Sequence, residues 1–308
     1  MRCRARGAGM LEFFEALFSR DVPFVMYAFL TGIVASLAFG IIGTYVVARR
    51  ISYIAGSIAH SVLAGVGVAL YLQKVHAMAW VTPMAGAVAS ALAAAVVIGL
   101  VNIYGKERED TVIGAIWATG MAVGLLFIAK TPGYIEPMSY LFGNILLITK
   151  HDLYMVLGLD ALVVGLAVAL YHKFLAVCFD EEFARLRGVH VQFYFLLLLC
   201  LTALTIVLLV SVVGIVMVIA LLTLPAGVAG QFSRRLWQMM GLSVIFCLFF
   251  TTSGLAVSYA HDLESGPTII VIAAAAYLII TIAVRLRKSL APRGSSAAEG
   301  AGASSPDA

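Results

Sequence analysis

Long stretches without a charged side chain constrain this chain more than any other feature of its sequence. A helix needs about 20 apolar residues to cross the ~30 Å hydrocarbon core of a bilayer. Uncharged stretches of about that length or longer run from 22 to 48, 51 to 73, 75 to 105, 111 to 129, 188 to 233, 236 to 261 and 265 to 284. Inside a bilayer the backbone must satisfy its own hydrogen bonds, which a helix does within one segment. We therefore expect an all-α integral membrane protein.

Charged side chains are too scarce to cover a soluble surface. Asp, Glu, Lys and Arg make up 12% of the 308 residues and apolar side chains 62%, whereas a soluble chain is about 25% charged. The mean hydropathy of +1.04 agrees. These values exclude a soluble enzyme, a nucleic-acid-binding domain and a disordered scaffold. The four cysteines lie far apart without a C-x-x-C pair, which favours free thiols over a zinc knuckle or a disulfide framework: Cys3, Cys178, Cys200 and Cys247.

The apolar stretches predict about nine spans. The stretch from 188 to 233 is too long for one helix and is expected to break near Val213 and Gly214. A further helix is expected from 153 to 172, although an acidic residue lies in its middle. The run from 137 to 149 is apolar but too short to cross, which is typical of a re-entrant or interfacial piece. The predicted fold is a polytopic bundle of eight or nine transmembrane helices.

A proline interrupts one of the predicted spans. Pro225 lies in the string LLTLPAG, where it removes one backbone hydrogen bond and bends a helix. Because freed carbonyls need partners, we expect a helix break there that faces protein or a water-filled cavity and not lipid.

Lysines and arginines indicate which loops face the cytoplasm. When loops alternate between the two sides, one side receives Arg49, Arg50, Lys106, Arg108, Lys173, Arg185, Arg187, Arg234, Arg235, Arg285, Arg287, Lys288 and Arg293. The other side receives only Lys74, Lys130 and Lys150. The positive-inside rule makes the first side cytoplasmic, together with the C-terminus. Nine spans then place the N-terminus outside, in conflict with Arg2, Arg4 and Arg6; either the chain has eight complete spans or natural translation starts at Met10.

Three regions follow from these patterns. Residues 1–21 are expected to form an N-terminal interfacial segment, since the stretch from Met10 places apolar and acidic side chains on opposite helix faces. Residues 22–288 form the membrane domain. Residues 289–308 are mostly small and polar, cannot build a core and are expected to be a disordered cytoplasmic tail.

A histidine inside an apolar span is costly and is therefore a functional candidate. His60 lies near the middle of the second span. Small residues on its helix face let a second helix approach closely, so the side chain is expected to face protein. A neutral imidazole is a common ligand for Zn²⁺, and a hydrogen bond across two helices is the structural alternative. At helical spacing its neighbours are Tyr53, Gly56, Ser57, Ala64 and Gly67.

Asp160 is the second ionisable residue inside a span. It lies on an otherwise aliphatic helix, where a cap, a bond to a neighbouring hydroxyl or a protonated state would each account for it, so a structural role is favoured. His76, His151 and His261 fall in loops beside charged residues and are expected to be solvated.

The longest polar interruption, CFDEEFARLRGVH from 178 to 190, has the pattern of a short amphipathic helix. Phe179, Phe183 and Leu186 share one face. Acidic residues occupy the first turn and arginines the last, which complements the helix dipole, and Gly188 suits a helix stop. Such a helix offers either a docking surface for another protein or a connection that lies on the lipid headgroups.

Motifs for chemistry within the chain are missing. The nearest approach to a phosphate-binding loop, GLVNIYGKE from Gly99, has five residues between its glycines instead of four. It also has Glu107 where a Ser or Thr should hold Mg²⁺. No H-E-x-x-H or G-x-S-x-G motif occurs. An ion-driven secondary carrier usually has several intramembrane acids or bases. One Asp and one His therefore give little support to such a carrier.

Five strings together resemble a known family. They are RRISYIAGSIAHSVLAGVG (49–67), MSYLFGNIL (138–146), FDEEFARLRGV (179–189), VGIVMVIALLTLPAGVA (213–229) and SGPTIIV (265–271). In order and spacing they are similar to the permease subunits of bacterial ABC transporters that import zinc, manganese or iron. The resemblance extends from Phe13 to Val284, and the first and third strings are the most specific.

The resemblance implies a permease domain over 22–288 that forms a dimer, with itself or with a related permease, in the bacterial cytoplasmic membrane. The permease would not be an enzyme; a separate cytoplasmic ATPase would bind ATP, and an extracytoplasmic binding protein would deliver the metal. The stretch 179–188 matches the family's coupling helix, which docks in the ATPase. The candidate coupling residues are Phe179, Glu182, Phe183, Arg185, Leu186 and Gly188.

The resemblance also implies a metal ligand at His60. The family's usual pattern has an Asp one turn before the matching histidine, whereas this chain has Gly56 there, with Ser57 on the same face. Mn²⁺ prefers carboxylate ligands and nitrogen suits Zn²⁺ better. The expected function is ATP-driven import of a divalent transition metal, with zinc favoured. A secondary metal or solute carrier without an ATPase is the alternative.

Overall fold

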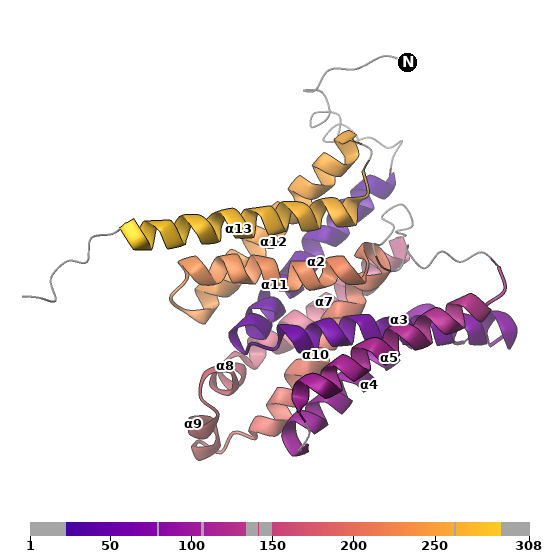
Figure 1. The fold of residues 1–308 in the computed structure, drawn as a ribbon, viewed down its shortest axis with the longest axis horizontal. Coiled ribbons are helices and arrows are strands. Elements are labelled where there is room, and N and C mark those ends of the chain that lie inside the picture. Colours follow the sequence, from indigo (N-terminus) through magenta and orange to yellow (C-terminus); the bar gives the residue numbers. More distant parts are fainter. Residues whose placement is uncertain are drawn as a thin grey trace, which may run out of the picture.

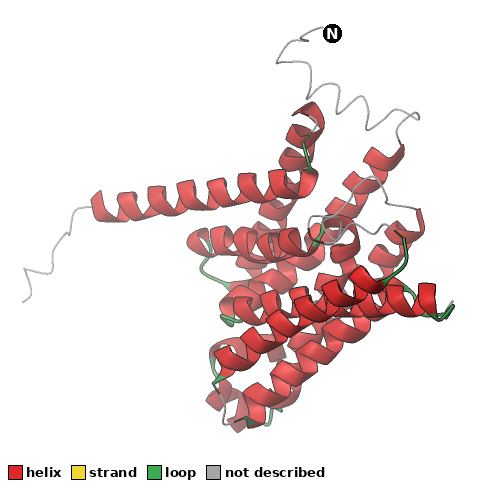
Figure 2. Cartoon of the chain, turned by 45° about the vertical axis from the view of Figure 1, so that its right-hand side comes forward, coloured by secondary structure: helices red, strands yellow, loops and turns green. Residues whose placement is uncertain are grey.

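The described part of the chain folds into α-helices. The computed structural model describes residues 23–78, 80–105, 108–133, 141, 150–261 and 263–290. Its helices are α2 (Pro23–Ala48), α3 (Ser52–Val75), α4 (Pro83–Tyr104), α5 (Glu109–Lys130), α7 (Lys150–Ala169), α8 (Tyr171–Phe179), α9 (Glu181–Leu186), α10 (Val191–Val213), α11 (Ile215–Phe232), α12 (Leu236–His261) and α13 (Ser265–Leu290). Figures 1 and 2 show them as a bundle of crossing rods. The predicted fold class is confirmed.

The number of spans agrees with the prediction. Among the described residues, eight helices are long and apolar enough to cross a membrane: α2, α3, α4, α5, α10, α11, α12 and α13. A ninth candidate is the pair formed by α7 and α8, whose axes are bent by 68°. The prediction of eight or nine spans is thus confirmed, and the bent pair is the source of the ambiguity.

The long apolar stretch divides at the expected glycine. Gly214 separates α10 from α11 and has a φ of 86°, a left-handed conformation that glycine adopts without steric cost. Other expectations fall on residues outside those described: the segment 1–21, the run 137–149 apart from Leu141, and the tail beyond Leu290.

Helix α3 lies at the centre of the bundle. In its most apolar window 78% of the residues are buried inside the protein, against 11% in α13. It packs most extensively against α5 and α4, and Figure 1 shows these three helices together in the lower right of the view. Side chains on most faces of α3 therefore contact protein, whereas α13 leaves most of its surface for lipid or partner subunits.

Glycines allow α3 to approach its two neighbours closely. A Cβ added at Gly67 would fall on the backbone of Gly124 in α5, and one added at Gly120 would lie 2.7 Å from the Cα of Ser61. On the other side, Gly65 meets the backbone of Gly86 in α4. This is the small-residue packing that membrane helices use, because lipid gives them no hydrophobic reason to associate.

Helix α2 is the hub of the second group of helices and packs against α12, α7 and α11. Two of its glycines mediate this: a Cβ at Gly40 would lie 2.6 Å from the backbone nitrogen of Val244 in α12, and Gly43 meets the carbonyl of Leu222 in α11. The second contact lies one turn before Pro225. The same small-residue principle therefore organises both halves of the bundle.

The structure corrects part of the expectation for Pro225. The residue is buried in protein, as expected, but it lies inside a continuous α11 and no helix break occurs. A proline removes only one hydrogen bond. Packing of α11 against α2, α12 and α13 holds the helix together across that single gap.

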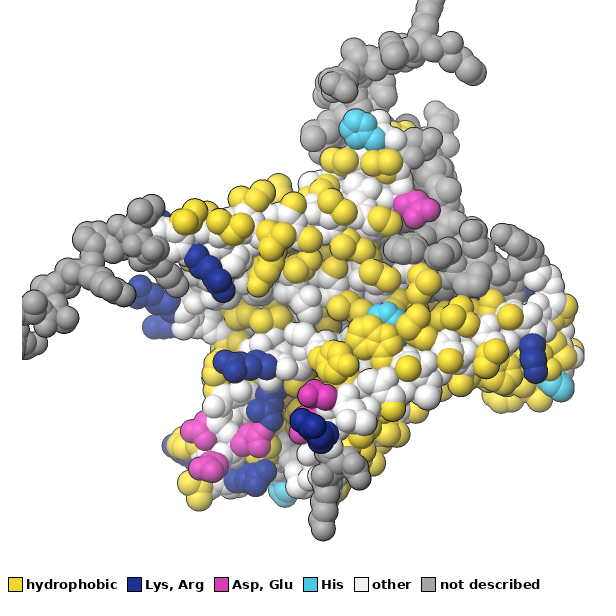
Figure 3. Space-filling view, viewed as in Figure 1, with side chains coloured by type: hydrophobic (Ala, Val, Ile, Leu, Met, Phe, Trp, Pro, Cys, Tyr) yellow, Lys and Arg dark blue, Asp and Glu magenta, His cyan; other side chains and the backbone are white. Residues whose placement is uncertain are grey.

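Basic side chains gather at one end of the helices. Three connections meet there, since Arg49 after α2, Asn102 near the end of α4 and Glu181 in α9 line one cavity. Figure 3 shows cationic side chains on the left and lower left of the molecule, around α9 and the ends of α11 and α13, with apolar side chains over most of the remaining surface. This distribution agrees with a cytoplasmic end defined by the positive-inside rule.

The glycine contacts of α3 predict a steric effect on stability. The variant Gly124→Ala places a Cβ 2.5 Å from the backbone carbonyl carbon of Leu63, so we expect destabilisation of about 1–3 kcal/mol from overpacking. The matched control is Gly158→Ala in α7, where a Cβ meets nothing within 4 Å. Thermal unfolding followed by size-exclusion chromatography in detergent compares the two variants, and equal stability would contradict the close α3–α5 contact.

Candidate functional site

His60 lies about two turns from the start of α3 with its ring buried in protein. Its Nδ1–H donates a hydrogen bond to the carbonyl oxygen of Gly56, 2.9 Å away. Because a carbonyl oxygen only accepts, this bond holds the neutral ring in the tautomer whose Nε2 carries the lone pair. Within the described residues no side chain bonds Nε2. The backbone therefore orients the imidazole and leaves its second nitrogen free for a ligand.

The indole of Trp117, which α5 contributes, covers one face of this imidazole. The two ring centroids are 4.2 Å apart and the planes are 22° from parallel. Tyr53, about two turns before His60 on α3, tilts against the same indole at 5.9 Å and 40°. We call Tyr53, His60 and Trp117 the aromatic cluster.

Ser57 and Gly56 define how α5 lies against α3 beside the cluster. The hydroxyl of Ser57 donates to the backbone carbonyl of Ile113 in α5 at 2.8 Å, so it joins the two helices. A Cβ added at Gly56 would lie 3.3 Å from Cζ3 of Trp117. Helix α5 therefore packs over the face of α3 that carries Gly56, Ser57 and His60. The only hydroxyl proton of Ser57 is used in the hydrogen bond to α5.

One copy of the chain does not surround an ion with protein ligands. Among the described residues no group of three or more His, Cys, Asp or Glu side chains lies close enough to hold a metal. A single imidazole nitrogen gives weak binding unless a second chain or water completes the coordination. The geometry therefore suits a transient contact along a pathway better than a resident metal site.

Asp160 has a structural partner in the fold. Its Oδ1 accepts a hydrogen bond from the backbone N–H of Ala38 in α2, 3.2 Å away, and the side chain is buried. The hydroxyl of Tyr45 in α2 donates to the carbonyl of Ala167 in α7 at 3.1 Å. Two polar bonds therefore join α2 to α7 inside the membrane domain, which supports the structural role that the sequence favoured for Asp160.

The polar interruption between spans folds as a short helix, but it is shorter than the sequence indicated. Phe179 ends α8, and Asp180 adopts extended backbone before α9 begins at Glu181. The cause is an N-cap: Oδ1 of Asp180 accepts the N–H of Phe183 at 2.8 Å. The single helix expected from 179 to 188 is therefore wrong, because this cap starts a new one.

Helix α9 presents an apolar face to solvent at a corner of the molecule, at the lower left in Figure 1. Phe183 is 49% exposed and Leu186 is 87% exposed. Phe179, at the end of α8, is also exposed. Gly188, with a φ of 74°, turns the chain toward α10. Large exposed apolar side chains grouped beside charged residues are typical of an interaction site.

An ion pair ties α9 to the connection between α2 and α3. The guanidinium of Arg49 contacts the carboxylate of Glu181 and lies over the ring of Phe195 in α10, 5.5 Å from its centroid. Arg185 adds a longer contact to Glu181 at 3.7 Å. Arg50 adopts a left-handed φ of 63° just before α3 begins. The ion pair therefore fixes the position of α9 relative to the connection that precedes α3.

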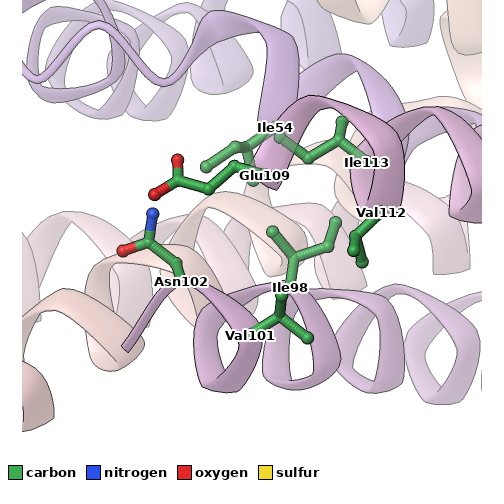
Figure 4. A pocket seen from close by; sticks show the side chains of 7 residues that line it. All are labelled: Ile54, Ile98, Val101, Asn102, Glu109, Val112 and Ile113. Atoms are coloured by element: carbon green, nitrogen blue, oxygen red, sulfur yellow. The ribbon is translucent and has the colours of Figure 1, made fainter. Parts of the chain in front are cut away.

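A polar cavity of about 420 Å³ opens beside this ion pair. Its lining includes Arg49, Arg50, Tyr53, Asn102, Glu109, Asp110 and Glu181. An adjoining narrow pocket has no room for a water molecule. Figure 4 shows Glu109 of α5 and Asn102 of α4 pointing toward each other at one end of that pocket, with aliphatic side chains around the rest. Since Tyr53 belongs to both the cavity and the aromatic cluster, the cavity lies between His60 and the end of the helices where the basic side chains gather.

Comparisons with known proteins assign the family. The model of the ABC 3 transport family matches residues 21–284. A probable metal transport system membrane protein of Chlamydia pneumoniae is 41% identical over 243 residues, which are 78% of this chain and 82% of the relative. This chain belongs to the ABC 3 transport family.

Further relatives of this ABC 3 permease agree in sequence and in fold. A manganese transport system membrane protein of Listeria innocua is 30% identical over 258 residues, which are 83% of this chain and 89% of the relative. A chain in the solved structure of PsaBC from Streptococcus pneumoniae in complex with Fab has a TM-score of 0.78 at 28% identity, covering 88% of this chain and 95% of that chain. The resemblance found in the sequence is confirmed, and the permease is a multi-pass protein of the bacterial cytoplasmic membrane.

Sequence reasoning did not assign three residues of this permease to the site. Trp117 received no role, although Gly120 and Gly124 follow it at helical spacing and indicate a face that approaches another helix. Arg49 and Glu181 were used only for topology and for the helix dipole. Their pairing connects positions 132 residues apart, and no local pattern reports such a contact.

The ion pair predicts how firmly α9 is held. In Glu181→Ala the N-terminal turn of α9 loses Arg49, so backbone amides from 181 to 188 should exchange with deuterium severalfold faster. Glu182→Ala is the matched control, because this neighbouring carboxylate is exposed and has no ion pair in the described residues. Hydrogen exchange measured by mass spectrometry reads the difference, and equal protection in both variants would refute the anchoring role of Glu181.

Proposed function

We propose that this permease is the membrane-spanning subunit of an ATP-driven importer of a divalent transition metal, with zinc as its favoured substrate. The observation that carries the proposal is the state of His60: a buried imidazole whose Nδ1–H is bonded to Gly56 and whose Nε2 has no hydrogen-bond partner among the described residues. Placing an imidazole inside the membrane costs free energy, so an intramembrane histidine is a functional candidate. Its backbone hydrogen bond is the support that metal-ligating histidines use.

In the proposed cycle, two permease copies, identical or related, form a dimer in which His60 of each copy offers its Nε2 atom to the metal pathway. Few ligands suit a pathway, because an ion that binds too tightly does not leave. Alternating access exposes this position first to an extracytoplasmic binding protein and then to the cytoplasm. The polar cavity on the cytoplasmic side of Tyr53 gives the ion a hydrated exit.

The partner for ATP hydrolysis is a separate cytoplasmic ATPase that docks on α9. Exposed apolar side chains at this cytoplasmic corner support the assignment, since they cross no lipid. The proposed coupling residues are Phe179, Glu182, Phe183, Arg185, Leu186 and Gly188. Residues 22–288 act as the permease domain, 1–21 as an interfacial segment and 289–308 as a cytoplasmic tail.

The proposal for zinc rests on the ligand chemistry beside His60. Gly56 offers no carboxylate and Ser57 bonds the backbone of α5, so nitrogen is the ligand that α3 supplies at this level. Nitrogen suits Zn²⁺, whereas Mn²⁺ prefers carboxylate and water oxygens. Some relatives carry manganese in their names at 28–30% identity, but the relatives from Chlamydia species, at 38–41%, are named only for metal transport. The local chemistry therefore supports the proposal of zinc.

A secondary carrier that works without an ATPase is the less favoured alternative. Membership of an ABC family argues against it, and so does Asp160, whose carboxylate bonds the backbone of α2. A purified permease that moves zinc in liposomes without ATP or an ATPase would support the carrier and overturn the importer.

The first prediction of the proposal concerns the ligand. His60→Ala should abolish zinc uptake in cells that express the complete transporter while leaving membrane insertion unchanged, because it removes the free nitrogen. The matched control is His76→Ala, at an exposed position after α3. Uptake of radiolabelled zinc and the yield of assembled complex are measured together. Normal uptake by His60→Ala would show that this histidine only joins helices.

The second prediction concerns coupling. Phe183→Asp should leave the permease inserted but prevent its copurification with the ATPase, because a carboxylate replaces the apolar docking side chain. Leu263→Asp is the matched control, since Leu263 is similarly exposed but lies between α12 and α13, at the opposite end of the helices. Should Phe183→Asp retain the ATPase and transport at the wild-type rate, α9 would not be the docking helix.

A further inference from the structure

Trp117 of α5 lies against His60 of α3, at the place where the two helices pack together. Its indole stacks on His60 at a centroid distance of 4.2 Å. The same indole covers position 56, because a Cβ there would lie 3.3 Å from Cζ3 and 3.6 Å from Cη2. The space beside the imidazole that a longer side chain at Gly56 would need is therefore filled by an aromatic ring.

The packing of α3 against α5 fixes this position of Trp117. One turn before it, Ile113 accepts the hydroxyl proton of Ser57. One turn after it, a Cβ at Gly120 would lie 2.7 Å from the Cα of Ser61. With contacts on both sides, the two helices cannot slide past each other or separate without losing them. The backbone of α5 is thus held against α3 on both sides of Trp117, and this keeps the indole over Gly56 and His60.

We propose that Trp117 is a specificity-determining residue of the metal pathway. Its indole occupies the volume of an oxygen ligand at position 56 and so favours an ion that accepts nitrogen over one that needs carboxylate. This inference rests on the proposed function and deepens it, because it names the side chain that excludes the second ligand.

The chemistry of the indole explains the direction of the effect. Its face offers a negative quadrupole but no lone pair that could replace a water molecule on the ion. An ion that passes His60 therefore gains one nitrogen and loses hydration on the side of Trp117. Zn²⁺ tolerates low coordination numbers with nitrogen ligands, whereas Mn²⁺ favours a full set of oxygen ligands. The cost of this passage is higher for Mn²⁺.

Four variants separate the effect of the indole from that of the helix contact. They are Trp117→Leu, Gly56→Asp, the double variant Gly56→Asp/Trp117→Leu, and Trp237→Leu as the control for loss of an exposed tryptophan, which lies in α12. Each is expressed with the complete transporter. Initial uptake of zinc and of manganese is measured separately, and each rate is divided by the amount of assembled complex.

The proposal predicts a non-additive result. Trp117→Leu should lower the ratio of zinc to manganese uptake about tenfold, the size of effect that a change in pocket shape produces, and Trp237→Leu should leave it unchanged. Gly56→Asp alone should assemble poorly and transport little of either metal, because its side chain meets the indole. The double variant should recover assembly and transport manganese faster than either single variant.

Two results would overturn the proposal. One is a ratio in Trp117→Leu equal to that of the wild type; the other is a Gly56→Asp variant that transports manganese as well as the double variant does. His60→Ala distinguishes this failure from failure of the proposed function. If His60→Ala stops uptake but Trp117→Leu does not change the ratio, only the specificity role falls; if His60→Ala transports zinc normally, the ligand role of His60 falls and the specificity role falls with it.

Discussion

The close approach of α3 to α5 is the contact on which the rest of the site depends. Gly67 and Gly124 bring the two backbones together, and Gly120 repeats the contact near Ser61. In a membrane this proximity gives dispersion contacts that lipid would otherwise supply, so small residues decide which helices pair. It also closes the face of α3 that carries His60. Without it, an imidazole in the second span would face lipid or water, and its orientation by the carbonyl of Gly56 would have no protein wall opposite it.

The connection between α2 and α3 links the helix of His60 to α9. It contains Arg49, which pairs with Glu181 in α9 and lies over Phe195 in α10. A part-buried ion pair next to an aromatic ring is more directional than an exposed one. A short helix that docks on another protein can thus displace the α2–α3 connection without unfolding any span. The bundle between them transmits such a movement because packed helices shift as rigid bodies.

Three of the polar side chains described inside the bundle join one helix to another, whereas the hydrogen bond of His60 stays within α3. Asp160 bonds the backbone of α2, Tyr45 bonds that of α7, and Ser57 bonds that of α5. Each satisfies a polar atom where no water could, and each therefore adds specificity to one helix contact. His60 differs because its backbone bond uses only one of its two ring nitrogens. In the proposed importer, the remaining nitrogen is the ligand that α3 offers to the metal ion.

The sequence by itself determined the class of fold, a count of eight or nine spans, the break at Gly214 and the family resemblance, and it predicts the cytoplasmic side. These follow from local quantities: the length of apolar stretches, the positions of charged residues and short strings in order. Tertiary structure alone decided that Trp117 covers His60, that Glu181 meets Arg49 across 132 residues, and that Asp160 meets Ala38 across 122. It also kept α11 continuous through Pro225 and divided α8 from α9 at Asp180. Such contacts depend on how helices pack in three dimensions. The periodicity of a single helix indicates which face is buried, but it does not indicate which residues of another helix pack against that face.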